Sequence, residues 1–261
     1  MSNGRHGLRL RPEQQSPSSL DEIIAKELAA KIIVSPLKIV AIDFDNTLID
    51  EDSGSWMSHR NTYIRNQFYW LIPHILHKKW ICIASFNQNT PHPSNENLGI
   101  VTQTVVRRLL KLTDRNLNKQ TIHYRLATEY KIIIEAYPGT VLSSIVYSYV
   151  IDYSKLLGRQ YGKFEHLESA IVKIKHYSTT PVSIEPFHVA LFDDHPRNIT
   201  VAKQIFPAAL ISIQEFSKKC NTMEPIMALI EHVVKRSTQE KDKWLLKKRK
   251  HARGNDRIDK M

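Results

Sequence analysis

The chain has 261 residues, of which 42% are hydrophobic and 24% charged, and its formal net charge is +11. This length suits one substantial domain with tails, and no apolar run approaches the roughly 20 residues that a membrane span needs. The two cysteines, Cys82 and Cys220, provide neither a disulfide framework nor a cysteine-based metal site. The polar start of the chain lacks the apolar region of a secretory signal. We therefore expect a globular protein of the cytoplasm or nucleus.

The first residues of the chain divide into a tail and a helix. Residues 1–19 are rich in Gly, Pro, Ser and Gln, and this composition predicts a disordered tail. From Leu20 onward, apolar side chains recur at helical spacing and stop before Pro36. The pattern predicts a helix that Ser19 caps.

Residues 38–50 (KIVAIDFDNTLID) join a short apolar run to a group of acids. The run at 39–42 has three β-branched residues, which is typical of a strand buried on both faces of a parallel sheet. Asp43 and Asp45 follow this strand directly. Taken alone, the two acids also fit a solvated turn. Because ligands collect at the carboxyl ends of strands in open α/β sheets, we expect both acids to lie at a site.

A second helix and a second strand follow. Residues 61–77 carry apolar side chains at helical intervals, and residues 80–84 (WICIA) form a short apolar run. This run ends in polar residues, Ser85 and Asn87, on either side of Phe86. A loop rich in Pro and Asn comes next, and residues 101–112 predict another helix.

The region from 121 to 161 is the least regular. Residues 131–135 (KIIIE) and 145–151 (IVYSYVI) both have the composition of strands, and one of them should be the third core strand. The helical pattern at 158–175 has Lys163 at its start. Lys155 and Lys173 are alternative cations for a site at this edge of the sheet.

The fourth apolar run, at 187–192 (FHVALF), also ends in acids. Asp193 and Asp194 repel each other, but paired carboxylates suit a hard cation that needs oxygen ligands. Residues 208–213 predict a fifth strand, and residues 223–234 a closing helix. Alternation of these strands and helices predicts the α/β class, with a parallel sheet.

Four segments resemble, in order, the motifs of the haloacid dehalogenase superfamily. They are D-F-D-N-T at 43–47, Ser85 after the second strand, Lys163 ahead of a helix, and F-D-D-x-x-x-N-I at 192–199. G-K-x-x-H-L at 162–167 is also similar to the lysine segment of the capless magnesium-dependent phosphatases. The resemblance covers roughly residues 36–215. It implies a Rossmann-like, doubly wound parallel sheet with small insertions and no large cap, whereas a small cap within 121–161 stays open.

The resemblance also implies a role for each motif residue. Asp43 would be the nucleophile, Asp45 the general acid and base, and Lys163 a catalytic cation. The implied phosphate-binding residues are Thr47, Ser85, Asn87 and Lys163, and the implied Mg²⁺ ligands are Asp43, Asp45, Asp193 and Asp194. Asp45 argues against a dehalogenase, because that reaction has no leaving oxygen to protonate.

The function implied by the resemblance is magnesium-dependent phosphate release. An open site without a large cap favours a macromolecular phosphate, such as a phosphoprotein or a nucleic-acid end. The alternative is a binding or regulatory protein that keeps this fold without turnover and acts through its basic end.

The end of the chain carries much of the positive charge. Residues 235–261 contain eleven Lys or Arg and four Asp or Glu, a formal charge of +7. We expect a flexible tail outside a catalytic domain at 20–234. Such a tail, with KKRKHAR at 247–253, indicates a nucleic-acid or acidic partner, nuclear import, or a solubilising role. No membrane partner is expected.

Overall fold

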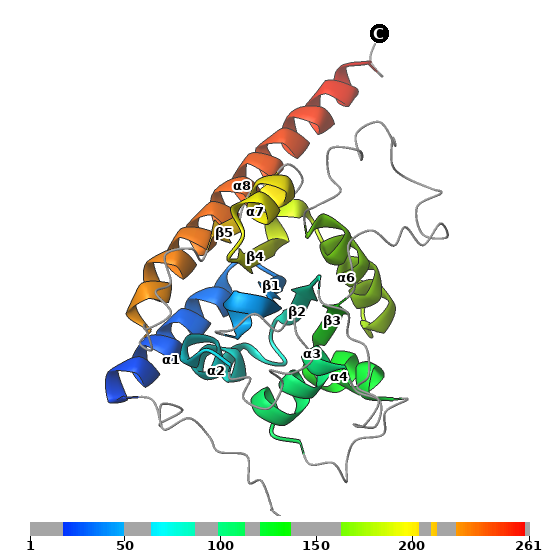
Figure 1. Cartoon of the computed structure of the whole chain (residues 1–261). Helices are drawn as coiled ribbons and strands as arrows, with labels where there is room; N and C mark the ends of the chain where they lie inside the picture. The colour runs from blue at the N-terminus through cyan, green and yellow to red at the C-terminus, as the bar shows by residue number, and fades with distance from the viewer. Residues whose placement is uncertain are drawn as a thin grey trace, which may run out of the picture.

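The computed structural model describes residues 18–49, 64–86, 99–112, 121–136, 163–203, 210–212 and 223–258. Within them, five parallel strands form one sheet in the order β3-β2-β1-β4-β5 (Figure 1). The strands are β1 (Ile39–Asp43), β2 (Trp80–Ser85), β3 (Ile132–Ala136), β4 (Val189–Asp193) and β5 (Leu210–Ser212). The α/β class and the parallel sheet are as the sequence predicted, and β3 is the first of the two candidates for the third strand. The other candidate, 145–151, lies outside the described residues.

Helices and turns connect these strands. The helices are α1 (Ser19–Val34), α2 (Asn66–Ile75), α3 (Ile100–Gln103), α4 (Ile122–Tyr130), α6 (Phe164–Tyr177), α7 (Pro196–Lys203) and α8 (Glu224–Ile258). The wide turns η1 (Phe44–Leu48) and η3 (Thr104–Leu109) follow β1 and α3, and the short turn η6 (Pro186–His188) precedes β4. The disordered tail predicted at 1–19 is wrong for Ser18 and Ser19, which cap and begin α1, and its other residues lie outside the described ranges. The predictions of small insertions and of no large cap also concern segments outside the described residues.

Helices cover both faces of the sheet. Val40 and Ile42 of β1 belong to a core cluster shared with α1, α2 and α8, whereas Ile39 and Ala41 belong to a second cluster shared with α6 and α7. Because successive side chains of a strand point to opposite faces, Asp43 falls on the same face as Ile39 and Ala41. The Asp43 side chain therefore lies on the face of the sheet that α6 covers.

The strand order contains one reversal, between β1 and β4. Strands β2 and β3 are added on one side of β1, and β4 and β5 on the other. In open parallel sheets, ligands bind at such a reversal, at the carboxyl ends of the strands. The last residue of each of these two strands is an aspartate, Asp43 and Asp193.

The cap of α1 lies one residue earlier than the sequence predicted. Ser18, and not Ser19, is the N-cap, because its hydroxyl accepts a hydrogen bond from the Asp21 backbone N–H at 3.1 Å. The carboxylate of Asp21 in turn accepts a hydrogen bond from the Met223 backbone N–H at 2.8 Å. The starts of α1 and α8 are therefore joined.

Helix α8 corrects the prediction of a flexible tail. It runs for 35 residues without a break at Val234, where the sequence predicted its end. Ser237 is fully buried and donates a hydrogen bond to the Phe187 backbone carbonyl at 2.6 Å, and the ring of Trp244 lies 5.7 Å from that of Phe187. The prediction failed because a few tertiary contacts, and no long apolar pattern, anchor this part of the helix. None of the helices in the described ranges is apolar over a length that could cross a membrane.

Candidate active site

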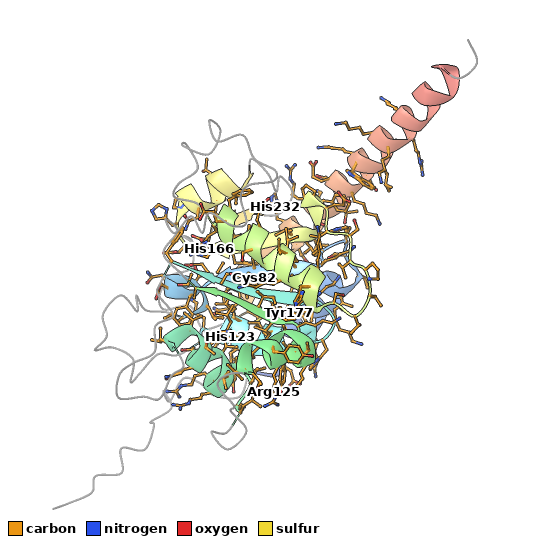
Figure 2. All side chains as sticks on the ribbon, turned by 90° about the vertical axis from the view of Figure 1, so that its right-hand side faces the viewer. Cys82, His123, Arg125, His166, Tyr177 and His232 are labelled. Atoms are coloured by element: carbon orange, nitrogen blue, oxygen red, sulfur yellow. The ribbon has the colours of Figure 1, made fainter. Side chains whose placement is uncertain are left out.

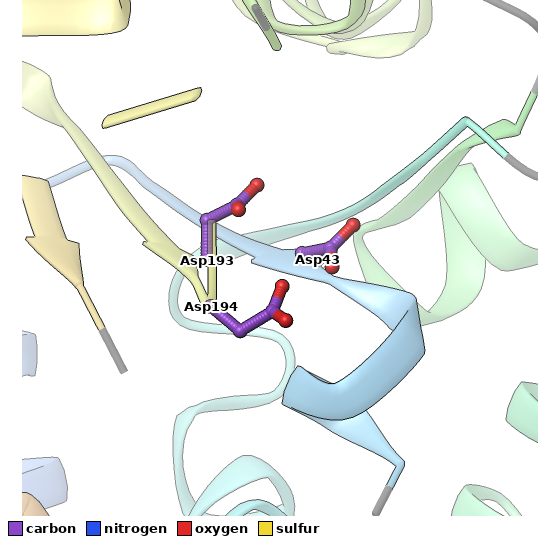
Figure 3. Close-up of side chains that lie close together, drawn as sticks. All are labelled: Asp43, Asp193 and Asp194. Carbon is purple, nitrogen blue, oxygen red and sulfur yellow. The ribbon is translucent and has the colours of Figure 1, made fainter. Parts of the chain in front are cut away.

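Three carboxylates meet at the reversal of strand order (Figure 3). Ile42 pairs with Phe192 across β1 and β4, so Asp43 and Asp193 leave the two strands at the same level. Asp194 follows directly. One carboxylate oxygen from each of the three residues lies within 4.8 Å of the other two. Oxygen ligands at this spacing could hold a metal ion.

Burial raises the pKa of all three acids in this cluster. Burial raises the pKa of Asp43 to about 7, and the charge of Asp193 adds to the effect while Lys163 opposes it. Burial likewise raises the pKa of Asp193 to about 6 and raises the pKa of Asp194. Three ionised acids beside one ammonium group leave a local charge of −2. A bound cation would remove this excess and hold all three acids in their ionised form.

Lys163 supplies the positive charge within the cluster. It is 1% exposed, and its Nζ lies 2.8 Å from Asp43 Oδ1. The same ammonium group stands over the ring of Phe86, 3.9 Å from the centroid. Lys163 occupies the N-cap position of α6, so the start of this helix carries the cation to the acid. Of the alternatives, Lys173 pairs instead with Glu135 at 2.8 Å, and Lys155 lies outside the described residues.

The turn after β1 is held in place from two sides. Asn46 has a positive φ of 53°, which lets the chain reverse sharply within η1. Thr47 is fully buried, and its hydroxyl accepts a hydrogen bond from the Asp194 backbone N–H at 3.0 Å. Arg65 donates to the Asn46 carbonyl at 2.8 Å. Thr47 therefore links the loop that carries Asp45 to the loop that carries the paired acids.

Asp45 and Ser85 are two further residues that the sequence predicted for the site. Asp45 is half-buried within η1, close enough to Asp194 for its charge to contribute to that residue's raised pKa. Ser85 is fully buried at the end of β2, one residue beyond Ala84, which pairs with Asp43. Both lie at the site edge of the sheet. Asn87 lies outside the described residues.

Asn198 is a site residue to which the sequence analysis gave no role. Its amide Nδ2 lies 2.9 and 3.0 Å from the two carboxylate oxygens of Asp193, and the His195 backbone N–H donates to one of them at 2.8 Å. These bonds orient the carboxylate and favour its ionised form. The signal was present, because Asn198 is the asparagine of F-D-D-x-x-x-N-I.

His166 and Phe86 were also missed. His166 is fully buried, its Nε2 lies 3.0 Å from the Ser85 carbonyl oxygen, and its ring meets Phe86 edge to face at 4.9 Å. The face of Phe86 is the surface on which Lys163 rests. This chain of contacts fixes the lysine relative to the end of β2. The only sequence signal for these contacts was His166, which is the histidine of G-K-x-x-H-L.

Glu135 is a buried acid with a structural role. It is 1% exposed at the end of β3, pairs with Lys173, and accepts a hydrogen bond from the Ser169 hydroxyl at 3.1 Å. Burial raises its pKa, and Lys173 opposes the shift. This ion pair attaches the middle of α6 to the sheet. It is separate from the cluster of Asp43, Asp193 and Asp194.

Comparisons with protein-family models and with curated protein sequences find no match for the chain.

Proposed function

We propose that this protein is a magnesium-dependent phosphohydrolase of the haloacid dehalogenase type, with Asp43 as the nucleophile and Asp45 as the general acid and base. The observation that carries the proposal is the contact of Asp43 with a buried cation, Lys163, inside a cluster of three carboxylates. Phosphoryl transfer needs such a combination of an anionic nucleophile and positive charge around the phosphoryl oxygens.

The donor set suits Mg²⁺. The three carboxylates of the cluster supply hard oxygen ligands with an excess of negative charge, and Asn198 keeps the Asp193 carboxylate oriented. The resemblance adds the backbone carbonyl of Asp45 to these ligands. When bound, Mg²⁺ would neutralise charge on the acids and on the phosphoryl oxygens.

The chain's own residues can then divide the reaction into two steps. A carboxylate oxygen of Asp43 attacks phosphorus, and the bond from phosphorus to the leaving oxygen breaks as Asp45 gives that oxygen a proton. In the second step Asp45 takes a proton from water. The resulting hydroxide attacks phosphorus, phosphate leaves, and the Asp43 carboxylate is regenerated.

Lys163 acts by charge and position. Because its ammonium group binds Asp43 Oδ1, it favours the ionised nucleophile and can also stabilise the charge of the transferring group. In a site shielded from water, such an interaction is stronger than it would be on the surface. Its support by Phe86 keeps the group in place before substrate arrives.

A phosphate-release screen tests the proposal. Phosphopeptides, 5′- and 3′-phosphorylated oligonucleotides and small aryl phosphates would each be incubated with the full-length protein, with Mg²⁺ or with EDTA. We expect release that requires Mg²⁺, with macromolecular phosphates preferred. A folded protein that releases phosphate from none of these classes would instead favour the regulatory alternative.

The paired acids should differ in their effect on magnesium. Asp193 is fully buried and held by Asn198, whereas Asp194 is half-buried. Asp193→Asn should raise the Mg²⁺ concentration for half-maximal activity by roughly 100-fold and Asp194→Asn by roughly 10-fold, the scale seen when groups around a metal are altered. Titration of activity against Mg²⁺ measures both. Equal shifts would mean that the two acids share the cation evenly, contrary to this assignment.

A further inference from the structure

The last part of α8 extends beyond the folded body (Figure 1). The helix starts beside Met223, which is joined to Asp21 at the start of α1. It then passes Phe187, just ahead of β4, through contacts from Ser237 and Trp244. The helix therefore runs opposite to the strands. In Figure 2 the start of α6, marked by His166, lies away from the projecting end of α8.

The projecting end of α8, residues 245–258, carries a run of basic side chains that point to most sides of the helix. Lys247, Lys248, Arg249 and Lys250 are consecutive and exposed. At about 100° per residue, four such side chains span about 300° of the helix circumference. Nitrogen-tipped side chains accordingly stand off this end in several directions in Figure 2. Residues 245–258 contain six Lys or Arg and one Asp, a formal charge of +5.

This distribution excludes two common uses of an exposed helix. A coiled-coil partner or a membrane surface needs a continuous apolar face. After Trp244, only Leu245 and Leu246 are apolar before the basic run, and they are consecutive rather than on one stripe. The flat acidic surface of a protein would meet only one side of the charged helix. A partner that surrounds the helix with negative charge fits it better.

We propose that the projecting end of α8 binds duplex DNA in the major groove, chiefly through backbone phosphates. The major groove of B-form DNA is about 12 Å wide and admits an α-helix of about 10–12 Å diameter. Side chains that leave the helix in opposite directions can then reach phosphates on both walls. Such contacts hold the protein on the duplex without reading its sequence.

This binding surface is independent of the proposed active site. From Glu224 to Lys247 the helix rises by about 35 Å, and it does so away from the edge that carries Asp43. DNA held at the projecting end is therefore not presented to the acids. The surface would localise the protein on DNA, and DNA binding can be measured independently of phosphate release.

Fluorescence anisotropy with a labelled 20-base-pair duplex of mixed sequence tests the inference on the full-length chain. Four phosphate contacts predict that the logarithm of the association constant falls with the logarithm of salt concentration with a slope of about −3.6. Combined Gln substitution of Lys247, Lys248, Arg249 and Lys250 should weaken binding at least tenfold at about 100 mM salt and flatten this slope. A variant with Lys247, Lys248 and Lys250 replaced by Arg should keep both.

A charge-matched control separates the helix from net charge. Gln substitution of Lys26, Lys78, Lys175 and Lys235 removes the same charge from exposed positions on the folded body. This control should bind DNA within about twofold of the wild type, and all variants should keep the wild-type melting temperature. Three results would overturn the inference: no duplex binding at 50 mM salt, an equal loss in the control, or tighter binding of polyglutamate or duplex RNA than of DNA.

Discussion

Asp43→Asn should abolish magnesium-dependent phosphate release while the protein stays folded. The amide fills the space of the carboxylate, but it is too weak a nucleophile to attack phosphorus. Turnover should fall by roughly 10⁴-fold or more, as when other enzymes lose a covalent nucleophile. The fold should tolerate the change, because Asp43 is a buried acid whose ionised form is disfavoured by its surroundings. Phosphate release and thermal melting should be measured on the same preparation.

Asp21 provides the matched control for this substitution. It is also a buried aspartate, but it lies at the start of α1 and accepts hydrogen bonds from Ser18 and Met223. Asp21→Asn should lower the melting temperature and leave the turnover number nearly unchanged. If folded Asp43→Asn protein kept its turnover, the aspartyl-phosphate mechanism would be wrong.

Most of the sheet could be predicted from the sequence, for a physical reason. Strands that are buried on both faces need side chains that are apolar throughout, and such runs are visible without knowledge of the partners. The runs at 39–42, 80–84 and 187–192 match β1, β2 and β4 to within one or two residues at each end. Two of these runs end in acids, so the sequence also predicted that Asp43 and Asp193 lie close together at one edge of the sheet.

The choice among polar residues needed the three-dimensional structure. The sequence offered Lys155, Lys163 and Lys173 as cations, and only the packing of α6 shows that Lys163 reaches Asp43 while Lys173 reaches Glu135. The hydrogen bond from Asn198 to Asp193 likewise depends on the conformation of the short turn between β4 and α7. Patterns of apolar residues contain no information about such side-chain geometry.

The sequence did not predict that α8 continues beyond Val234, for a related reason. Its second half is mostly polar, so the composition indicated a solvated tail. Its anchoring depends on Ser237 and Trp244, which contact Phe187 from about 50 residues further along the chain. These two contacts anchor the helix to η6, the turn ahead of β4. Because the second half of α8 is also rich in residues with high helix propensity, the helix continues after its apolar pattern ends.

Lys163→Met is the second substitution with a large expected effect. Met fills much of the same volume but removes the charge that lies 2.8 Å from Asp43 Oδ1. Loss of a preorganised charge from a site shielded from water should lower the turnover number by roughly 10²- to 10³-fold. The effect on stability should depend on pH, because the lysine faces Asp43, whose pKa is raised.

The sign of this pH effect follows from the raised pKa of Asp43. Burial lifts that pKa from 3.8 to about 7, so between these values the folded protein binds a proton that the unfolded chain releases. Without a divalent cation, the stability that this proton contributes is complete below pH 3.8 and is lost as the pH rises through about 7. Lys163 opposes the shift, and its removal should raise the pKa of Asp43 further. The melting temperature of Lys163→Met protein in EDTA should therefore fall more steeply than that of the wild type between pH 5 and 8.

Lys173→Met is the control that distinguishes catalysis from packing. Lys173 belongs to the helix that Lys163 begins, and it also lies 2.8 Å from a buried acid, Glu135, but at the end of a different strand. Its loss should lower the melting temperature while leaving the turnover number within about threefold of the wild type. Because both variants remove one ammonium group from one buried carboxylate, a difference confined to turnover locates the chemistry at Asp43. If both variants lost turnover equally, the lysine contact at Asp43 would be structural, and another cation would have to serve the phosphoryl group.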